Sequence, residues 1–110
     1  MTVEQLSEYG QFNILSMPRP DREINGAYTG DILSLAMSKL KPDNVWLTAL
    51  CNINVVAVAF NADVACVILV ENGALDADAK TAANQNGVNV LSAKSGAFDT
   101  AVLIAKTGAL

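Results

Sequence analysis

The chain has 110 residues and a formal net charge of −4; hydrophobic residues make up 52% of it and charged residues only 16%. This composition excludes a disordered chain and predicts one domain over residues 1–110. The seven lysines and arginines are scattered singly, which argues against nucleic-acid binding, since that requires clustered positive charge. No apolar run approaches the roughly 20 residues of a membrane-spanning helix, and residues 1–5 do not resemble a secretory signal.

Few charged residues are available to cover the surface of a monomer. We therefore expect the excess apolar surface to be covered in a homodimer or by a protein partner. Cys51 and Cys66 are too few for a disulfide framework, so the reducing cytoplasm is the expected location. The chain has no histidine to serve as a base for a cysteine nucleophile, and we expect no metal site and no cofactor.

The first 25 residues predict a short helix followed by extended segments. Thr2 and Gln5 fit a capping box at the start of a helix over residues 2–9. The apolar run over residues 12–15 predicts a strand, and an edge strand is expected over residues 22–25.

The segment of residues 24–34 has the composition of a turn that opens a helix. Thr29 is expected to cap a helix over residues 30–40, with Asp31 complementing the helix dipole in its first turn. Gly30 allows a ligand or another backbone to approach closely, so this helix start could hold an anion or a carbonyl group. The side chains expected on the buried face of the helix are Ile32, Leu35, Ala36 and Leu40.

The second half of the chain predicts alternating strands and helices. Strands are expected over residues 45–50, 65–70 and 88–91, and helices over residues 52–60, 76–86 and 95–106. Residues 52–60 mix strand-forming valine with helix-forming alanine, and a helix is favoured because no turn signal divides the segment from its neighbours. Asp76 and Ser95 are the expected N-caps, and Gly87 ends the middle helix. The side chains expected to face inward are Ala79, Ala82 and Ala83 in the middle helix, and Phe98, Ala101, Val102 and Ala105 in the last.

This alternation predicts an α/β fold, a three-layer single domain with a mostly parallel central sheet flanked by helices. In such sheets ligands bind beyond the carboxyl ends of the strands, where residues 71–73 and 92–95 would also lie. Asn52 and Asn54 could bond a ligand through their amides or simply cap their helix. The candidate ligand-binding residues are Thr29, Gly30, Asp31, Thr48, Asn52 and Asn54.

Catalytic machinery is not expected. Residues 87–95 only superficially resemble a phosphate-binding loop, because the second glycine is Ala93 and the spacing is one residue too long. Asp31 is the one plausible base, and a role at the helix dipole explains it more simply. We therefore name no catalytic residue and expect that the protein is not an enzyme.

The chain resembles the DRTGG domains, which are related in fold to the N-terminal domain of the HPr kinase/phosphorylase. The resemblance covers about residues 10–107, although the five-letter signature is not present as a contiguous string. Residues 51–54 depart from the more polar, glycine-bearing turn of many members. The segments that carry the resemblance are residues 26–34, 46–59, 65–71 and 87–92 and the helix that contains Phe98.

The resemblance implies a regulatory module that helps to form dimers. DRTGG domains occur beside CBS domains in some pyrophosphatases, near adenine-nucleotide sites, and stand-alone versions are often encoded near iron-only hydrogenase components. We therefore hypothesise a non-catalytic, homodimeric regulatory or protein-interaction domain linked to hydrogenase or energy metabolism. The alternative is a sensor that binds an adenine nucleotide or phosphate at the carboxyl edge of the sheet. The expected dimer faces are residues 53–60 and the helix of Phe98.

Overall fold

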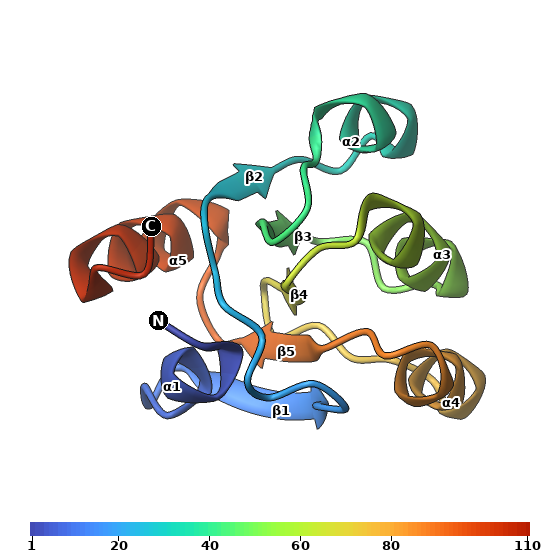
Figure 1. Cartoon of the computed structure of the whole chain (residues 1–110), viewed down its shortest axis with the longest axis horizontal. Coiled ribbons are helices and arrows are strands. Elements are labelled where there is room, and N and C mark those ends of the chain that lie inside the picture. The colour runs from blue at the N-terminus through green and yellow to red at the C-terminus, as the bar shows by residue number, and fades with distance from the viewer.

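A computed structural model describes residues 1–110 and places a five-stranded sheet at the centre of the molecule (Figure 1). The strands are β1 (Phe12–Ser16), β2 (Ala27–Thr29), β3 (Val45–Thr48), β4 (Cys66–Leu69) and β5 (Val90–Ala93). The helices are α1 (Val3–Ser7), α2 (Leu33–Lys39), α3 (Ile53–Ala62), α4 (Ala77–Gln85) and α5 (Ala97–Thr107). The strand order is β1-β5-β4-β3-β2, with β1 antiparallel to β5 and the other neighbours parallel.

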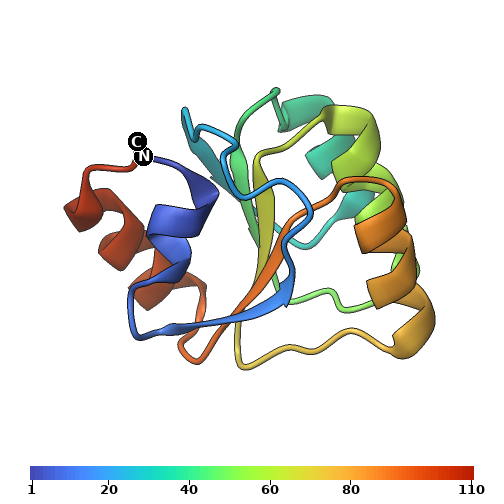
Figure 2. The same ribbon diagram turned by 60° about the horizontal axis from the view of Figure 1, so that its bottom comes forward.

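Helices cover both faces of the sheet, which confirms the predicted three-layer α/β fold. Helices α2, α3 and α4 lie on one face, and α1 and α5 lie on the other (Figures 1 and 2). The central strands β3, β4 and β5 are buried along their whole length because both of their faces are covered. No helix combines the length and the apolar character that crossing a bilayer requires.

Local sequence signals set several helix ends as predicted. Thr2 and Gln5 form a reciprocal capping box at α1. Asp76 caps α4 by accepting a hydrogen bond from the N–H of Ala79 at 2.8 Å. Gly87 follows α4 with a φ of +70°, a left-handed conformation that glycine adopts without steric cost.

The edge strand lies later in the chain than predicted. Residues 22–25 form no strand: Glu23 makes only an isolated bridge with Thr2, and the segment bonds mainly to the N-terminus. The edge strand in this part of the chain is β2, whose residues pair with β3 in parallel. The prediction was wrong because the partner of an edge strand is not a local property of the sequence.

Helix α2 is shorter than predicted and begins after the polar turn. Thr29 belongs to β2 and caps nothing, and Asp31 precedes the helix, whose N-cap is Ile32 without a side-chain hydrogen bond. The predicted inner face was half right, since Ala36 and Leu40 are buried. The exposed members of that face are Ile32 and Leu35.

The last helix is rotated relative to the prediction. Gly96, not Ser95, is the N-cap of α5, because the Ser95 hydroxyl bonds Gln11 Oε1 instead. Thr100 and Ile104 are the buried side chains of α5. Apolar residues occur around much of this helix, so their spacing did not define one face. Of the residues expected inside, Phe98, Val102 and Ala105 are exposed and Ala101 is half-buried.

Two predicted strands also changed their bounds. The strand expected over residues 88–91 is β5, which starts at Val90. The backbone carbonyl of Asn89 still accepts the N–H of Val67, and its side-chain amide donates to the carbonyls of Arg19 and Ala65. The strand expected over residues 45–50 ends at Thr48.

An ion-pair cluster joins the loops at the amino ends of the central strands. The Arg22 side chain is only 11% exposed and lies between two aspartates. It contacts Asp43 Oδ1 at 2.9 Å, and Asp63 through Oδ1 at 3.0 Å and the backbone carbonyl at 2.6 Å. Both aspartates have positive φ values, so the arginine holds two loops in a conformation that non-glycine residues rarely adopt.

Candidate functional site

The carboxyl ends of β2 and β3 meet, as predicted, and bring Asp31 to Thr48. Asp31 Oδ1 accepts hydrogen bonds from Thr48 Oγ1 and from the N–H of Ala49, both at 2.8 Å. Thr48 Oγ1 in turn accepts the N–H of Leu50 at 3.2 Å. The Asp31 carboxylate therefore fixes the loop that leaves β3, instead of complementing the dipole of α2.

Gly30 is placed by the single tryptophan. The indole N–H of the fully buried Trp46 donates to the Gly30 carbonyl at 3.0 Å. A Cβ at position 30 would lie 2.9 Å from the Tyr28 hydroxyl, so glycine leaves room for this ring. The space at Gly30 is filled by the protein's own side chain.

Asn52 and Asn54 lie at the start of α3. Asn52 Oδ1 accepts the backbone N–H of Asn54 at 2.9 Å, which makes Asn52 the N-cap. Of the two predicted roles, capping is therefore confirmed for Asn52. The Asn54 side chain is exposed and makes no hydrogen bond within the chain.

The turn after β4 lies at the same edge of the sheet, where residues 71–73 were expected. Its backbone conformation was not predicted. Glu71 and Asn72 both have left-handed backbone angles, with φ values of 58° and 59°. Their N–H groups donate to the carbonyls of Ser95 and of Ala93, the last residue of β5, at 2.9 and 2.7 Å. The Glu71 carboxylate lies beside Gly96, at the N-terminus of α5, where negative charge is favourable.

Cys51 is exposed at this edge and Cys66 is buried in β4. The Cys51 thiol lies 3.4 Å from the Ala49 carbonyl, and the chain supplies no histidine to act as its base. Burial raises the pKa of the Cys66 thiol from 9.0 to about 12, which keeps this thiol protonated and unreactive.

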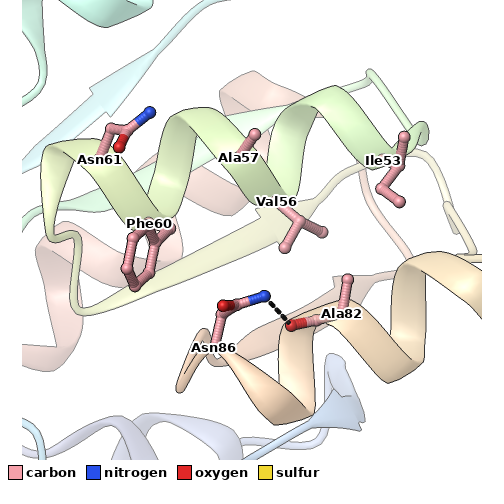
Figure 3. Close-up of a pocket in the computed structure, with 7 residues that line it drawn as sticks. All are labelled: Ile53, Val56, Ala57, Phe60, Asn61, Ala82 and Asn86. Atoms are coloured by element: carbon pink, nitrogen blue, oxygen red, sulfur yellow. Dashed lines mark hydrogen bonds between the residues drawn. The ribbon is translucent and has the colours of Figure 1, made fainter.

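Of the residues predicted to bind a ligand at this edge, only Thr29 lines a hollow, the one between β2 and α5. No hollow opens among Asp31, Thr48, Asn52 and Asn54. A groove of about 300 Å³ lies between helices α3 and α4, and we call it the α3–α4 groove. Phe60 and Val56 point from α3 toward α4 across the groove, while the Asn86 amide is bonded to the Ala82 carbonyl (Figure 3). The groove is lined by Ile53, Val56, Ala57, Phe60, Asn61, Ala82 and Asn86.

Sequence reasoning did not find the α3–α4 groove. The prediction of a helix over residues 52–60 did not indicate that Phe60 is exposed, yet this residue is 55% exposed. A large aromatic residue near the end of a helix was the one available signal, but Ala82 and Asn86, which complete the groove, lie more than 20 residues beyond Phe60.

No protein-family profile matches the chain, and no curated protein matches its sequence. Among solved structures, the chain is similar to the CBS and DRTGG domains of the regulatory region of Clostridium perfringens pyrophosphatase, which was solved with its activator, diadenosine tetraphosphate. The TM-score is 0.70 at 10% sequence identity over 84% of this chain, which spans 41% of that structure. The likeness establishes a DRTGG-like fold.

Proposed function

We propose that this chain is a regulatory domain without catalytic activity that acts as a homodimer. The observation that carries the proposal is the exposure of large apolar side chains on helices that lie on opposite faces of the sheet. Phe60 on α3 is 55% exposed and Phe98 on α5 is 78% exposed. Several such side chains on a small domain favour a covering partner, because their burial in an interface is stabilising.

The state of the polar edge supports the non-catalytic part of the proposal. The one carboxylate predicted as a plausible base, Asp31, already accepts two hydrogen bonds from the β3 loop. Asn52 is engaged as a helix cap. These groups stabilise the edge of the sheet, whereas a nucleophile needs a free base within hydrogen-bond reach.

The homodimer is testable by sedimentation equilibrium of the full chain. We expect a dimer mass at tens of micromolar, with a monomer appearing on dilution, because the exposed apolar side chains would be buried in the interface. A monomer mass throughout this range would contradict the dimer and leave a different protein as the regulatory partner.

The proposed family, cellular location and metabolic link of the chain go with the regulatory role. We propose membership of the DRTGG domain family, and the similar fold supports it. A cytoplasmic location fits two cysteines that are both free. The link to hydrogenase or energy metabolism rests on the family resemblance alone.

A second candidate function is the sensing of an adenine nucleotide or phosphate. The observation that favours it is the solved structure of similar fold, which was obtained with a diadenosine nucleotide. Two places could receive the ligand: the carboxyl edge at Asn52 and Asn54, and the α3–α4 groove, where Phe60 offers an aromatic face for a base.

Thermal unfolding against AMP, ADP, ATP and inorganic phosphate tests this function and its place. A nucleotide at about 100 times its Kd should stabilise the fold by about 2.7 kcal/mol, which for this length raises the Tm by roughly 10 °C. Phe60→Ala should abolish the rise if the base sits in the groove. Asn52→Asp keeps the capping oxygen but adds a negative charge, so it should abolish the rise if phosphate binds the carboxyl edge. A flat panel would contradict nucleotide sensing.

A further inference from the structure

Strand β2 is one edge of the sheet and bonds only β3. The Gly26 carbonyl accepts the N–H of Val45 at 2.9 Å, and the N–H of Gly30 donates to the Leu47 carbonyl at 3.1 Å. In a parallel pair, every second residue of a strand bonds the neighbour. Residues 26, 28 and 30 therefore face β3, and the two residues between them face away from the sheet.

The outward residues, Ala27 and Thr29, are both exposed and direct their N–H and C=O groups into solvent. Natural proteins protect such edges by keeping the strand very short, or with charged residues, proline or a bulge. The opposite edge has these devices, because β1 is irregular between Ile14 and Ser16 and Pro18 follows it. Strand β2, Ala-Tyr-Thr, is protected only by its length of three residues: it has neither charge nor proline, and it pairs without a bulge.

Exposed apolar side chains gather on the two helices that flank β2. Helix α2 lies on one face of the sheet beside this strand and α5 on the other (Figure 1). Between β2 and α5 there is also an apolar hollow of about 190 Å³ that Ala27, Thr29 and Leu110 help to line. Of the ten exposed large hydrophobic residues, six lie on or next to these helices: Ile32, Leu35, Met37, Phe98, Val102 and Leu110.

We propose that β2 pairs antiparallel with β2 of a second copy of this chain, which joins two five-stranded sheets into one. The inference rests on the proposed homodimer and assigns its interface to the edge that α5 and Phe98 flank, which leaves Phe60 on α3 outside it. A two-fold axis beside Tyr28 places Ala27 opposite Thr29 of the partner subunit, and Thr29 opposite Ala27 of the partner subunit. Each of these pairs exchanges two N–H···O bonds, so every outward backbone group of the strand gains a partner.

The flanking helices supply the area that a three-residue strand lacks. Stable interfaces bury about 1,200 Å² or more, far beyond what so short a ladder covers. Pairing at β2 brings α2 toward α2 of the second copy on one face and α5 toward α5 on the other. Side chains of these helices that lie beside the two-fold axis then pack against the second copy, which is the occupant that satisfies the outward backbone groups of β2.

Sedimentation equilibrium of Thr29→Pro and of its matched control, Thr29→Val, tests the edge. Proline removes an outward N–H without touching a bond to β3, and β-sheet angles at Tyr28 are compatible with a following proline. Because the substitution is present in both copies, the dimer loses two inter-chain hydrogen bonds. We therefore expect the dimer Kd to rise roughly 30-fold. Valine retains the N–H, and Thr29→Val should dimerise as the wild type does. Circular dichroism reports whether each variant is folded.

Register-specific cross-linking gives a second readout that does not depend on proline. In a Cys51→Ser background, the double variant Ala27→Cys/Thr29→Cys should form a disulfide-linked dimer on mild oxidation, because the paired Cα atoms lie about 5.5 Å apart. Each single variant should remain unlinked, since neither residue lies opposite itself.

The outcomes separate this inference from the proposed function. A wild-type dimer that Thr29→Pro leaves intact and that does not cross-link overturns the β2 interface but keeps the homodimer. A wild-type monomer overturns both. Cross-linking in the single variants as readily as in the double variant would show random collision and would also overturn the proposed register.

Discussion

Replacing Arg22 by methionine is expected to lower the free energy of unfolding by about 2–3 kcal/mol, which corresponds to a fall in Tm of about 10 °C. The guanidinium contacts Asp43 and Asp63, and it is largely buried. Its removal leaves two carboxylates near each other without a cation, in two loops with left-handed backbone angles. Urea and thermal unfolding of the full chain measure the loss.

Two variants serve as controls for Arg22→Met. Arg22→Lys keeps the charge but loses the planar fork that reaches both aspartates, so its stability should be intermediate. Arg19→Met removes the other arginine, whose side chain is exposed and makes no ion pair, and should change stability by no more than about 0.5 kcal/mol. Equal losses in Arg19→Met and Arg22→Met would contradict the stabilising role of the cluster.

Alkaline pH is expected to destabilise the fold through Cys66. The pKa of this thiol is about 12 in the folded chain and about 9 when it is exposed on unfolding. Between these values the unfolded chain releases a proton that the folded chain retains, so stability is full below pH 9 and falls as the pH rises toward 12. The single thiol should lower the free energy of unfolding by about 1.4 kcal/mol between pH 8 and pH 10.

Urea unfolding at pH 8, 9 and 10 measures this slope, and the two cysteines provide the comparison. Cys66→Ala removes the titrating group and should lose this part of the pH dependence, whatever its stability at pH 8. Cys51→Ala should retain it, since Cys51 is exposed and Cys66 is unchanged. The same slope in Cys66→Ala as in the wild type would assign the pH dependence to other groups.

Local signals predicted the parts of the fold whose partners lie close in sequence. Thr2 with Gln5 and Asp76 with Ala79 bond over three residues, so their capping could be deduced from spacing alone. The continuous apolar run 65–70 predicted a strand covered on both faces, because no other arrangement buries every side chain of such a run. The structure confirms this prediction, because β4 lies at the centre of the sheet.

The candidate site was predicted in its place but not in its contacts. The sequence located Asp31 and Thr48 at the same edge of the sheet, since parallel strands end on the same side. It did not predict that Asp31 bonds Thr48 and Ala49, across 17 and 18 residues, instead of the helix that follows it. A carboxylate accepts any N–H or O–H that the fold brings near, and that choice is made by the packing of β2 on β3.

By itself, then, the sequence determined the order of strands and helices, the three-layer class and several helix caps, because hydrogen bonds and apolar periodicity over a few residues are sufficient for them. Only the tertiary structure decided which strands form the edges of the sheet, which face of α5 is buried and where the α3–α4 groove opens. Each of these depends on contacts between segments far apart in the chain. Ala27, Phe60 and Phe98 are exposed because no distant segment of the chain packs over them. The residues next to them in the sequence do not indicate this.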